Sequence, residues 1–299
     1  MRVLGTLCRF ELVSRTEPHD LLIRGPFADG SARRRWLNRG LHWRERISSP
    51  WRQPAQPLRL HVSSENPFAE NYQNFEQSGC DFGLGHELRV GDLRYQRMPH
   101  WWNYVDFSTD GIPSPGEWIR LGEPLQQEQL LRPLDWNRSG AQRAAFVASY
   151  LNDQRRYLWR EVDRALPVDG FGRAFDASIA DHTRSNFTKR ELLSGYCFNL
   201  CPENAIAPGY YTEKIPESFA CGAIPIGYVD RHAEVDFNPR SFLNLYDYLP
   251  GGVAEGLARD LACPQRLSEL TETPLLTAPV AIDGLVDFLR LVLVQARAD

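Results

Sequence analysis

The sequence predicts an α/β protein built from two domains. The stretch Tyr196–Tyr228 has the pattern of one strand–loop–helix–strand unit, the repeating unit of an α/β domain. Short apolar strands alternate with loop or helical stretches in the N-terminal part, so a further open sheet is expected there. With 299 residues, the chain is long enough for two domains of ordinary size, each with its own core.

The N-terminal part contains several predicted strands, closed by turn residues such as Gly25 and Pro26. They are expected at Val3–Val13, His19–Phe27, Leu58–Val62 and Cys80–Leu84, followed by the aromatic-rich run Leu93–Tyr104. The loop 65–68 lies at the carboxyl end of the third strand, where open α/β sheets bind ligands. A catalytic group would be useful at this position.

Residues 108–139 have several Pro and Gly residues and little periodicity, which indicates a substrate-side loop followed by an inter-domain linker. A strand at Ala144–Ser149 and a helix from about Asp153 to Ala165 then begin the second domain. The turn Pro167–Gly172 closes that unit. We therefore place the first domain at residues 1–138 and the second at residues 139–275.

The best-defined element is the second strand–loop–helix–strand unit. The apolar run Tyr196–Cys201 predicts a buried strand, and a helix is expected from Glu213 to about Cys221, ended by Gly222. Ala223–Tyr228 is the next strand. Polar side chains crowd the loop at the carboxyl end of the first strand, where ligands bind. They are Glu203, Asn204, Tyr210, Thr212, Glu213 and Lys214.

Two helices are expected near the C-terminus, at Val253–Ala262 and about Ile282–Ala298, from apolar residues three and four positions apart. The second helix lies in a C-terminal segment, residues 276–299, that we expect to pack back on the domains. A helix on a membrane surface is the alternative, but the polar face lacks the lysines and arginines typical of one.

Composition excludes several functional classes. Hydrophobic residues make up 42% and charged residues 24%, as in an ordinary globular protein. The net charge of −4 does not indicate a basic surface that would bind nucleic acid. No apolar run reaches the ~18 residues that span a bilayer, and the N-terminus lacks a signal-peptide pattern. We expect a cytoplasmic protein, with peripheral membrane contact left open. The basic run 32–46 fits a solvated helix face better than a phosphate or anionic-lipid patch.

The reactive side chains offer two further hints. Six cysteines are scattered, mostly among apolar neighbours, so reduced thiols without disulfides or a zinc site are expected. Among 34 lysines and arginines only Lys189 and Lys214 are lysines. Lys214 either supplies a compact, mobile ammonium to the loop cluster, or is a solvated residue paired with Glu213 or Glu217. The lysine count alone does not choose between these.

Four ordered motifs within about fifty residues resemble the donor-binding core of the family 10 α1,3/α1,4-fucosyltransferases. These motifs are Tyr196–Asn204 (YCFNLCPEN), Tyr210–Lys214 (YYTEK), Gly222–Ile226 (GAIPI) and Phe237–Asn244 (FNPRSFLN). A sparser resemblance extends through the N-terminal half, at Glu65–Pro67 (ENP), Asp81–Gly85 (DFGLG) and Arg94–Pro99 (RYQRMP). It implies a GT-B fold, in which two Rossmann-like domains face each other across a cleft.

The resemblance also implies the reaction: inverting transfer of L-fucose from GDP-fucose to a hydroxyl of an acceptor glycan, of α1,3/α1,4 type, with a GlcNAc-containing acceptor expected. Glu65 occupies the family's position for the general base, which takes the proton of the attacking hydroxyl. Arg155 and Lys214 would stabilise the leaving diphosphate. Counting forward from Ser149 would place Arg156 in that role instead of Arg155.

The remaining roles follow from the same match. The residues expected on the donor side are Glu203, Asn204, Tyr210, Thr212, Glu213, Arg156 and Gly172. Those expected on the acceptor side are Asn66, Arg97, Trp101 and Trp102. The tryptophans would stack on an apolar sugar face, or else they fill a core. The acceptor would be an oligosaccharide or a glycolipid.

Some positions depart from the family pattern. Pro202 replaces an aromatic or apolar residue, and Gly227–Arg231 replaces the usual loop near the donor. Another sugar nucleotide therefore remains an alternative, as does an inactive carbohydrate-binding relative. No D-x-D motif lies near a strand end, so we expect metal-independent catalysis that needs no cofactor, in which basic residues take the cation's role. A nucleotide kinase is excluded because the chain has no phosphate-binding P-loop motif.

Overall fold

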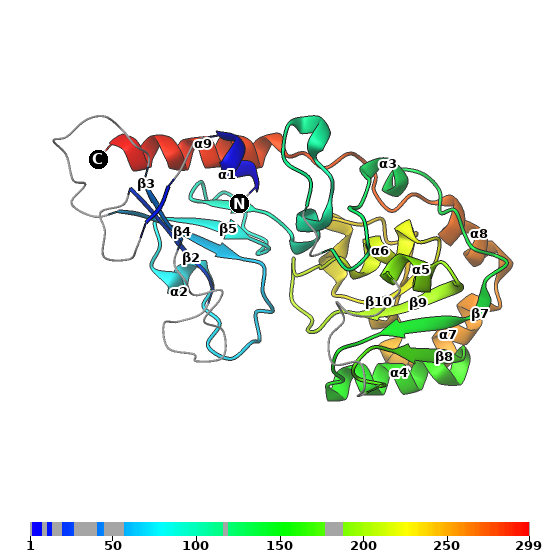
Figure 1. Cartoon of the computed structure of the whole chain (residues 1–299). Helices are drawn as coiled ribbons and strands as arrows, with labels where there is room; N and C mark the ends of the chain where they lie inside the picture. Colours follow the sequence, from blue (N-terminus) through cyan, green and yellow to red (C-terminus); the bar gives the residue numbers. More distant parts are fainter. Residues whose placement is uncertain are drawn as a thin grey trace. The chain divides into compact units, whose positions relative to one another are not determined.

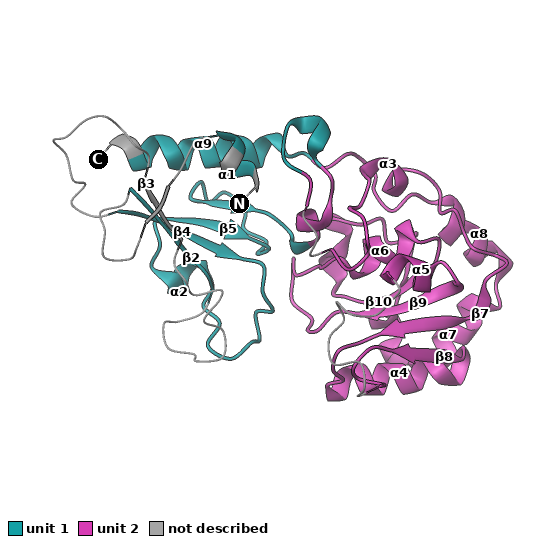
Figure 2. Cartoon of the chain, in the orientation of Figure 1, with its two compact units in different colours: residues 1–100, 107–113, 281–299 teal, residues 101–106, 114–280 magenta. Residues whose placement is uncertain are grey.

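The chain folds into two compact units (Figure 2). The computed structural model describes residues 2–7, 11–13, 20–26, 41–44, 57–115, 119–176 and 188–298. Unit 1 consists of residues 1–100, 107–113 and 281–299, and unit 2 of residues 101–106 and 114–280. Each unit is described by itself.

The segment expected as a linker packs largely with unit 2. Leu121, Leu125 and Leu130 in this segment are fully buried, and the short helix α3 (Gln127–Leu130) lies within it. The backbone N–H of Leu134 donates to the carbonyl of Thr271, and that of Leu276 donates to the carbonyl of Leu130. These leucines hold the segment against the rest of unit 2, although its turn residues had predicted a linker. The boundary between the two units therefore lies before residue 138.

Unit 1 contains a six-stranded sheet whose order is β1-β3-β2-β4-β5-β6. The strands are β1 (Glu11–Val13), β2 (Leu21–Arg24), β3 (Leu41–Arg44), β4 (Leu58–Ser63), β5 (Phe82–Gly85) and β6 (Tyr95–Arg97). Strand β3 runs antiparallel to its neighbours, whereas β2, β4, β5 and β6 are parallel. The predicted strands near residues 19–27, 58–62 and 80–84 are therefore confirmed.

Helix α9 (Asp283–Ala298) packs on unit 1, as Figure 1 shows. The ring of Phe288 meets that of Phe82 edge-on, with the centroids 5.9 Å apart. No helix of the described residues is long and apolar enough to span a membrane. The predicted C-terminal helix is confirmed.

Two predictions for unit 1 are wrong. Residues 2–7 form helix α1 (Arg2–Leu7) rather than the start of a strand, and of the described residues in the predicted strand only Glu11–Val13 is extended. A short apolar run does not distinguish a strand from a buried helical turn by periodicity, and α1 packs against α9. In the basic run, residues 41–44 are a strand rather than a helix face, and residues 32–40 and 45–46 lie outside the described residues.

Unit 2 contains a parallel five-stranded sheet whose order is β11-β10-β9-β7-β8. The strands are β7 (Ala141–Val147), β8 (Val168–Phe171), β9 (Tyr196–Pro202), β10 (Ile224–Tyr228) and β11 (Leu243–Asn244). The helices are α4 (Asp153–Ala165), α5 (Lys189–Leu193), α6 (Lys214–Ala220), α7 (Val253–Leu261) and α8 (Pro264–Glu272). The predicted strands at 144–149, 196–201 and 223–228 and the predicted helices at 153–165, 213–221 and 253–262 are confirmed.

Gly222 shows why the second half of this unit is so well specified. Its φ of +76° is a left-handed conformation that ends α6, and a Cβ there would lie 2.5 Å from the carbonyl oxygen of Asp135. Only glycine satisfies both conditions. The chain then enters β10 directly.

The strand order of unit 2 reverses between β9 and β7. From β7 the chain passes through α4 to β8 on one side, and from β9 it passes through α6 to β10 on the other. Figure 1 shows α6 and α4 on opposite faces of the sheet. Loops that leave neighbouring strands in opposite directions open a crevice at the carboxyl end of the sheet, the usual ligand site of such folds.

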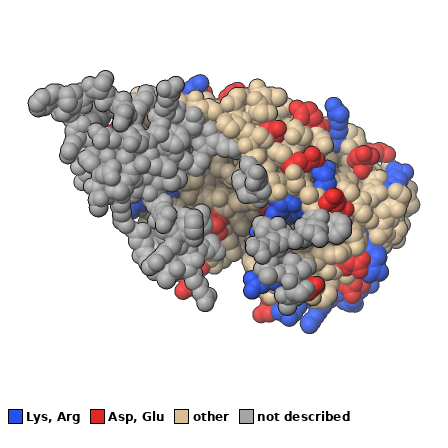
Figure 3. All heavy atoms as spheres, in the orientation of Figure 1, with Lys and Arg blue, Asp and Glu red and all other residues tan. Residues whose placement is uncertain are grey.

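Charge is mixed on the surface of unit 2. On the face shown in Figure 3, basic and acidic residues of this unit are interspersed. The five cysteines among the described residues are free thiols, namely Cys80, Cys197, Cys201, Cys221 and Cys263, and Cys8 lies outside that set. The surface shown carries no single-sign stripe among the described residues.

Candidate functional site

The two loops at the reversal point are joined by Asn152. Its Oδ1 accepts the backbone N–H of Arg155 at 2.8 Å, so it caps α4, and its Nδ2 donates to the carbonyl of Asn204 at 3.2 Å. One side chain thus fixes the β7–α4 loop against the β9–α6 loop. This holds Arg155 near the segment that carries Lys214.

Glu203 is the centre of the polar cluster. It is only 1% exposed, and its carboxylate accepts the backbone N–H of Thr212 at 2.7 Å and the Thr212 hydroxyl at 2.8 Å. The Nζ of Lys214 donates to the other oxygen at 2.8 Å. The buried Glu203 carboxylate therefore orients Thr212 and Lys214. This structural role differs from the direct contact with the donor that was predicted for Glu203.

Lys214 is held by Glu203 but keeps a free donor. Its ammonium has three N–H donors, of which one contacts Glu203 and one contacts the Thr212 hydroxyl at 2.7 Å. Within the part of the chain that the structure describes, the third has no hydrogen-bond partner. Burial opposes the charge, but the carboxylates of Glu203 and Glu213 outweigh it and raise the pKa of Lys214. A charged, oriented donor suits an anionic oxygen.

Arg155 is buried, with 3% exposed surface, whereas Arg156 is exposed. The Arg155 guanidinium lies over the rings of Phe146 and Tyr150, and its Nη1 donates to the Tyr150 carbonyl at 3.0 Å. Burial lowers its pKa, against the attraction of Tyr150 and Glu203. Its Nε has no partner among the described residues, which favours Arg155 over Arg156 as the anion-binding arginine.

A second buried ion pair stands beside the first. The Nζ of Lys189, at the start of α5, contacts the Oε2 of Glu217 on α6. Glu217 is 1% exposed, and burial raises its pKa against the opposing effect of Lys189. The sequence motifs had assigned Lys189 no role, although it is one of only two lysines in the chain. Their scarcity was the signal available in the sequence.

The other predicted donor-side residues lie in the same region of unit 2. Tyr210 is buried, and Glu213 precedes α6 and hydrogen-bonds Tyr104. Gly172 has a φ of +89° at the end of β8, where its carbonyl accepts the N–H of Phe175. Residues 177–187, which follow, lie outside the described residues. The roles proposed for these residues stay predictions.

Glu65 lies in unit 1, directly after β4, as predicted. Its loop is well defined. The Oδ1 of Asn66 accepts the backbone N–H of Phe68 at 2.9 Å, and Asn71 adopts a left-handed φ of +61°. Asn66 therefore caps this turn, so Glu65 is not needed to cap the backbone N–H of Phe68. Asn66 thus has a structural contact in addition to the acceptor role predicted for it.

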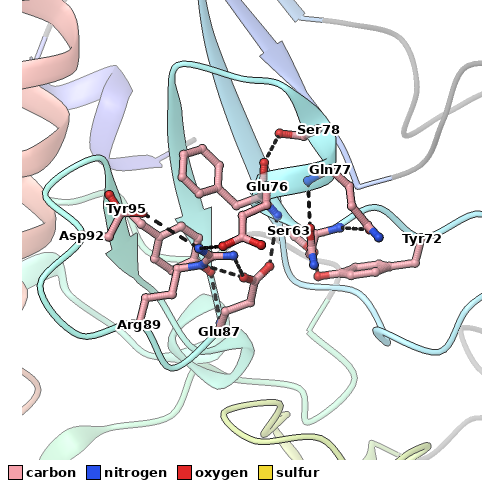
Figure 4. A network of polar contacts seen from close by, with 11 residues as sticks. Ser63, Tyr72, Glu76, Gln77, Ser78, Glu87, Arg89, Asp92 and Tyr95 are labelled. Atoms are coloured by element: carbon pink, nitrogen blue, oxygen red, sulfur yellow. Dashed lines mark hydrogen bonds and ion pairs between the residues drawn. The ribbon is translucent and has the colours of Figure 1, made fainter.

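Unit 1 also holds a polar network around Arg89 (Figure 4). Arg89 pairs with Glu87 and Glu76 and lies over the rings of Phe75 and Tyr95. The hydroxyl of Tyr95 accepts the backbone N–H of Glu87 at 3.0 Å. This network fixes the loop between β5 and β6 beside the Glu65 loop, since both follow parallel neighbouring strands.

The aromatic acceptor platform needs one correction. Trp101 is only 2% exposed, and its ring packs against those of Trp102 and Phe237, so it is a core residue. Trp102 is half-buried. Trp101 and Trp102 lie in unit 2, whereas Arg97, at the end of β6, lies in unit 1. The proposed contacts of Arg97 and Trp102 with an acceptor stay predictions.

Among the described residues, no group of three His, Cys, Asp or Glu side chains is placed so that it could hold a metal ion. Glu65 belongs to unit 1 and the donor-side residues belong to unit 2. The cleft expected between the units therefore stays a prediction.

Comparison with known proteins supports the sequence motifs. Residues 138–261 match the model of the glycosyltransferase family 10 (fucosyltransferase) C-terminal domain. Over 107 residues the chain is 38% identical to the alpha-(1,3)-fucosyltransferase FucT of Helicobacter pylori. That match covers 35% of this chain and 21% of the relative, so the chain spans about a fifth of the relative's length.

Solved structures of α1,3-fucosyltransferases are also similar. One crystallised with GDP-fucose gives a TM-score of 0.55 at 25% identity, covering 80% of this chain and 76% of its own. Another gives 0.58 at 25% identity, covering 93% and 79%. A third, with GDP, gives 0.55 at 20% identity, covering 98% and 95%, and supports the fold alone. The predicted α/β class and GT-B type are confirmed.

Proposed function

We propose that the chain belongs to glycosyltransferase family 10 (fucosyltransferase), whose C-terminal model matches residues 138–261, and that it transfers L-fucose from GDP-fucose to a hydroxyl of an acceptor glycan. The observation that carries the proposal is the pair of cations at the reversal point of unit 2. Arg155 and Lys214 each have an N–H donor without a partner among the described residues, and both lie near the buried Glu203. Such donors fit the diphosphate of a nucleotide sugar.

The chemistry follows from these groups. Fucose transfer breaks the bond between the sugar and the diphosphate, and the leaving GDP gains negative charge. Lys214 meets that charge with a point ammonium and Arg155 with a planar guanidinium. Because Glu203 already orients Lys214, little reorganisation is needed when the charge develops.

Glu65 is the proposed general base. It would take the proton of the attacking acceptor hydroxyl, a contribution typically worth ~10²–10⁴-fold in rate. Direct attack by the acceptor inverts the configuration of the anomeric carbon, so the product would be an α-fucoside from a β-linked donor. We propose an α1,3 or α1,4 linkage to a GlcNAc-containing oligosaccharide or glycolipid, without a metal cofactor.

The first experiment is calorimetric titration with GDP, GDP-fucose, GDP-mannose and UDP-galactose in the presence of EDTA. The proposal expects binding of GDP and GDP-fucose alone. Binding of another sugar nucleotide instead would exclude fucose as the donor but keep the diphosphate site. If no nucleotide bound, the carbohydrate-binding alternative would replace the enzyme.

Catalysis is tested next, with GDP-fucose and a panel of GlcNAc-containing acceptors. Glu65→Gln should abolish transfer while leaving GDP binding within about twofold of wild type, since it removes only the base. Glu70→Gln, an exposed residue of the same loop, is the matched control. Proton NMR of the product gives the anomeric configuration, and a β-fucoside would contradict inversion.

A further inference from the structure

The two lysines of the chain form neighbouring buried ion pairs, of which the proposed mechanism uses only one. Lys214 pairs with Glu203, and Lys189 pairs with Glu217. The side chain of Lys189 is 15% exposed and that of Glu217 is 1% exposed. Placing an ammonium in such a position is costly, and arginine serves at every other basic position of the chain.

The second pair is connected to the donor site through α6. Glu217 lies three residues after Lys214 on this helix, so their side chains share a face. The backbone N–H of Glu217 donates to the carbonyl of Glu213 at 2.8 Å. The carboxylate of Glu213 raises the pKa of both lysines, because its negative charge is close enough to interact with each of them.

Charges in this cluster are balanced. Three carboxylates, Glu203, Glu213 and Glu217, face three cations, Arg155, Lys189 and Lys214. Without Lys189, three negative groups would face two positive ones at the place where an anionic ligand must bind. Coulomb interactions are strong between charges that are close together and poorly solvated. The excess negative charge would therefore repel an anionic ligand.

We propose that Lys189 is a positioning residue of the donor site, which neutralises Glu217 and Glu213 and thereby leaves the charge of Lys214 available to the donor's diphosphate. This inference rests on the proposed function, because it requires a diphosphate beside Lys214. The alternative is that the pair only holds α5 against α6.

The two roles predict effects of different sign. Lys189→Met removes a positive charge, and Glu217→Gln removes a negative one. If the charge matters, GDP binding weakens in the first variant and tightens in the second. If the pair is only structural, both variants weaken GDP binding, because each breaks the same contact.

The experiment is calorimetric titration of each variant with GDP, GMP and guanosine at low ionic strength. We expect GDP binding ~3- to 10-fold weaker in Lys189→Met and ~2- to 5-fold tighter in Glu217→Gln. GMP should show a smaller change, and guanosine almost none. Arg143→Gln, which removes a positive charge from an exposed pair with Asp169 on β7 and β8, should leave the three affinities unchanged.

Folding is checked by thermal melting, because either single variant leaves a buried charge unpaired. The double variant Lys189→Gln/Glu217→Gln carries no unpaired charge and serves as the folded reference. Relative to it, restoring Lys189 should tighten GDP binding, and restoring Glu217 should weaken it.

Weaker GDP binding in both single variants, or equal losses for GDP and guanosine, would overturn the inference and leave the proposed function intact. Failure of the wild-type protein to bind GDP would overturn both.

Discussion

The hydroxyl of Ser63 donates a 3.1 Å hydrogen bond to the hydroxyl of Tyr72, and this contact closes the loop that carries Glu65 (Figure 4). Ser63 ends β4, and Tyr72 directly follows the left-handed turn at Asn71. The backbone N–H of Tyr72 donates to the carbonyl of Ala69 at 3.0 Å. The loop is therefore tied at both ends, which would hold Glu65 in place for the role of general base proposed for it.

Tyr72→Phe removes this single hydroxyl while preserving the ring. We expect kcat to fall ~3- to 30-fold with little change in KM for the donor, because Glu65 loses alignment and the donor site in unit 2 is untouched. Steady-state kinetics with varied donor measure the split. Tyr157→Phe, at a half-exposed tyrosine of α4, is the control. Unchanged kcat in Tyr72→Phe would show that the loop does not depend on the hydroxyl.

Glu203→Gln tests the buried anchor of unit 2. The substitution leaves the ammonium of Lys214 without its carboxylate, and breaking a buried pair typically costs ~3–5 kcal/mol of stability. Urea unfolding should show a loss of this size. Asp169→Asn breaks the exposed pair with Arg143 and should cost far less. Equal losses in the two variants would argue that Lys214 is solvated in solution.

The sequence predicted unit 2 better than unit 1, for a physical reason. In unit 2, buried parallel strands appear as continuous apolar runs, and caps such as Asn152 and Gly222 mark the helix ends. In unit 1 the first apolar run is short, and its packing against α9 made it the helix α1. Contacts between segments far apart in the chain decide such cases, and a local pattern does not contain them.

The sequence predicted which residues form the candidate site better than it predicted the role of each residue. The motifs located Glu203 and Lys214, but only the structure shows that Glu203 is an internal anchor. Trp101 was proposed as a sugar platform because a sequence does not tell an exposed ring from a core ring. Lys189 lies outside the four motifs of the family resemblance, and its pairing with Glu217 depends on how α5 and α6 meet.

Two buried histidines predict acid sensitivity of unit 1. Burial, with the nearby charge of Arg89, lowers the pKa of His61 to about 4, and burial, with nearby His100, lowers that of His86 to about 4. Both nitrogens of His61 lack hydrogen-bond partners in the described part of the chain, so nothing compensates for a charged ring.

The direction of the effect follows from these values. A histidine with a folded pKa below the unfolded value of 6.5 stabilises the protein above pH 6.5, and this stability is lost as the pH falls toward 4. For His61 the loss between pH 8 and pH 5 is about 2 kcal/mol. Urea unfolding at several pH values should show the decline.

His61→Phe should remove the share due to His61 and flatten the pH dependence, because the ring already packs near Phe75. His232→Gln is the matched control, since the side chain of His232 is 60% exposed. An unchanged slope in His61→Phe would place the acid sensitivity elsewhere.

Arg155 and Arg156 form a natural comparison, because they are adjacent on α4 but differ in burial. Arg155 faces the polar cluster with its Nε unpartnered among the described residues, whereas Arg156 is exposed and donates to the carbonyl of Leu151 at 3.3 Å. Arg155→Gln should weaken GDP binding ~10- to 100-fold, the range expected for lost hydrogen bonds to a charged group.

Arg156→Gln should change GDP binding less than about threefold, as expected for an exposed, screened charge. Arg155→Lys keeps the charge but not the planar fork, so its affinity should lie between those of wild type and Arg155→Gln. Calorimetry measures all three variants, and melting curves confirm that each is folded. A larger loss in Arg156→Gln than in Arg155→Gln would transfer the diphosphate contact to Arg156, and the register counted forward from Ser149 would then be the correct one.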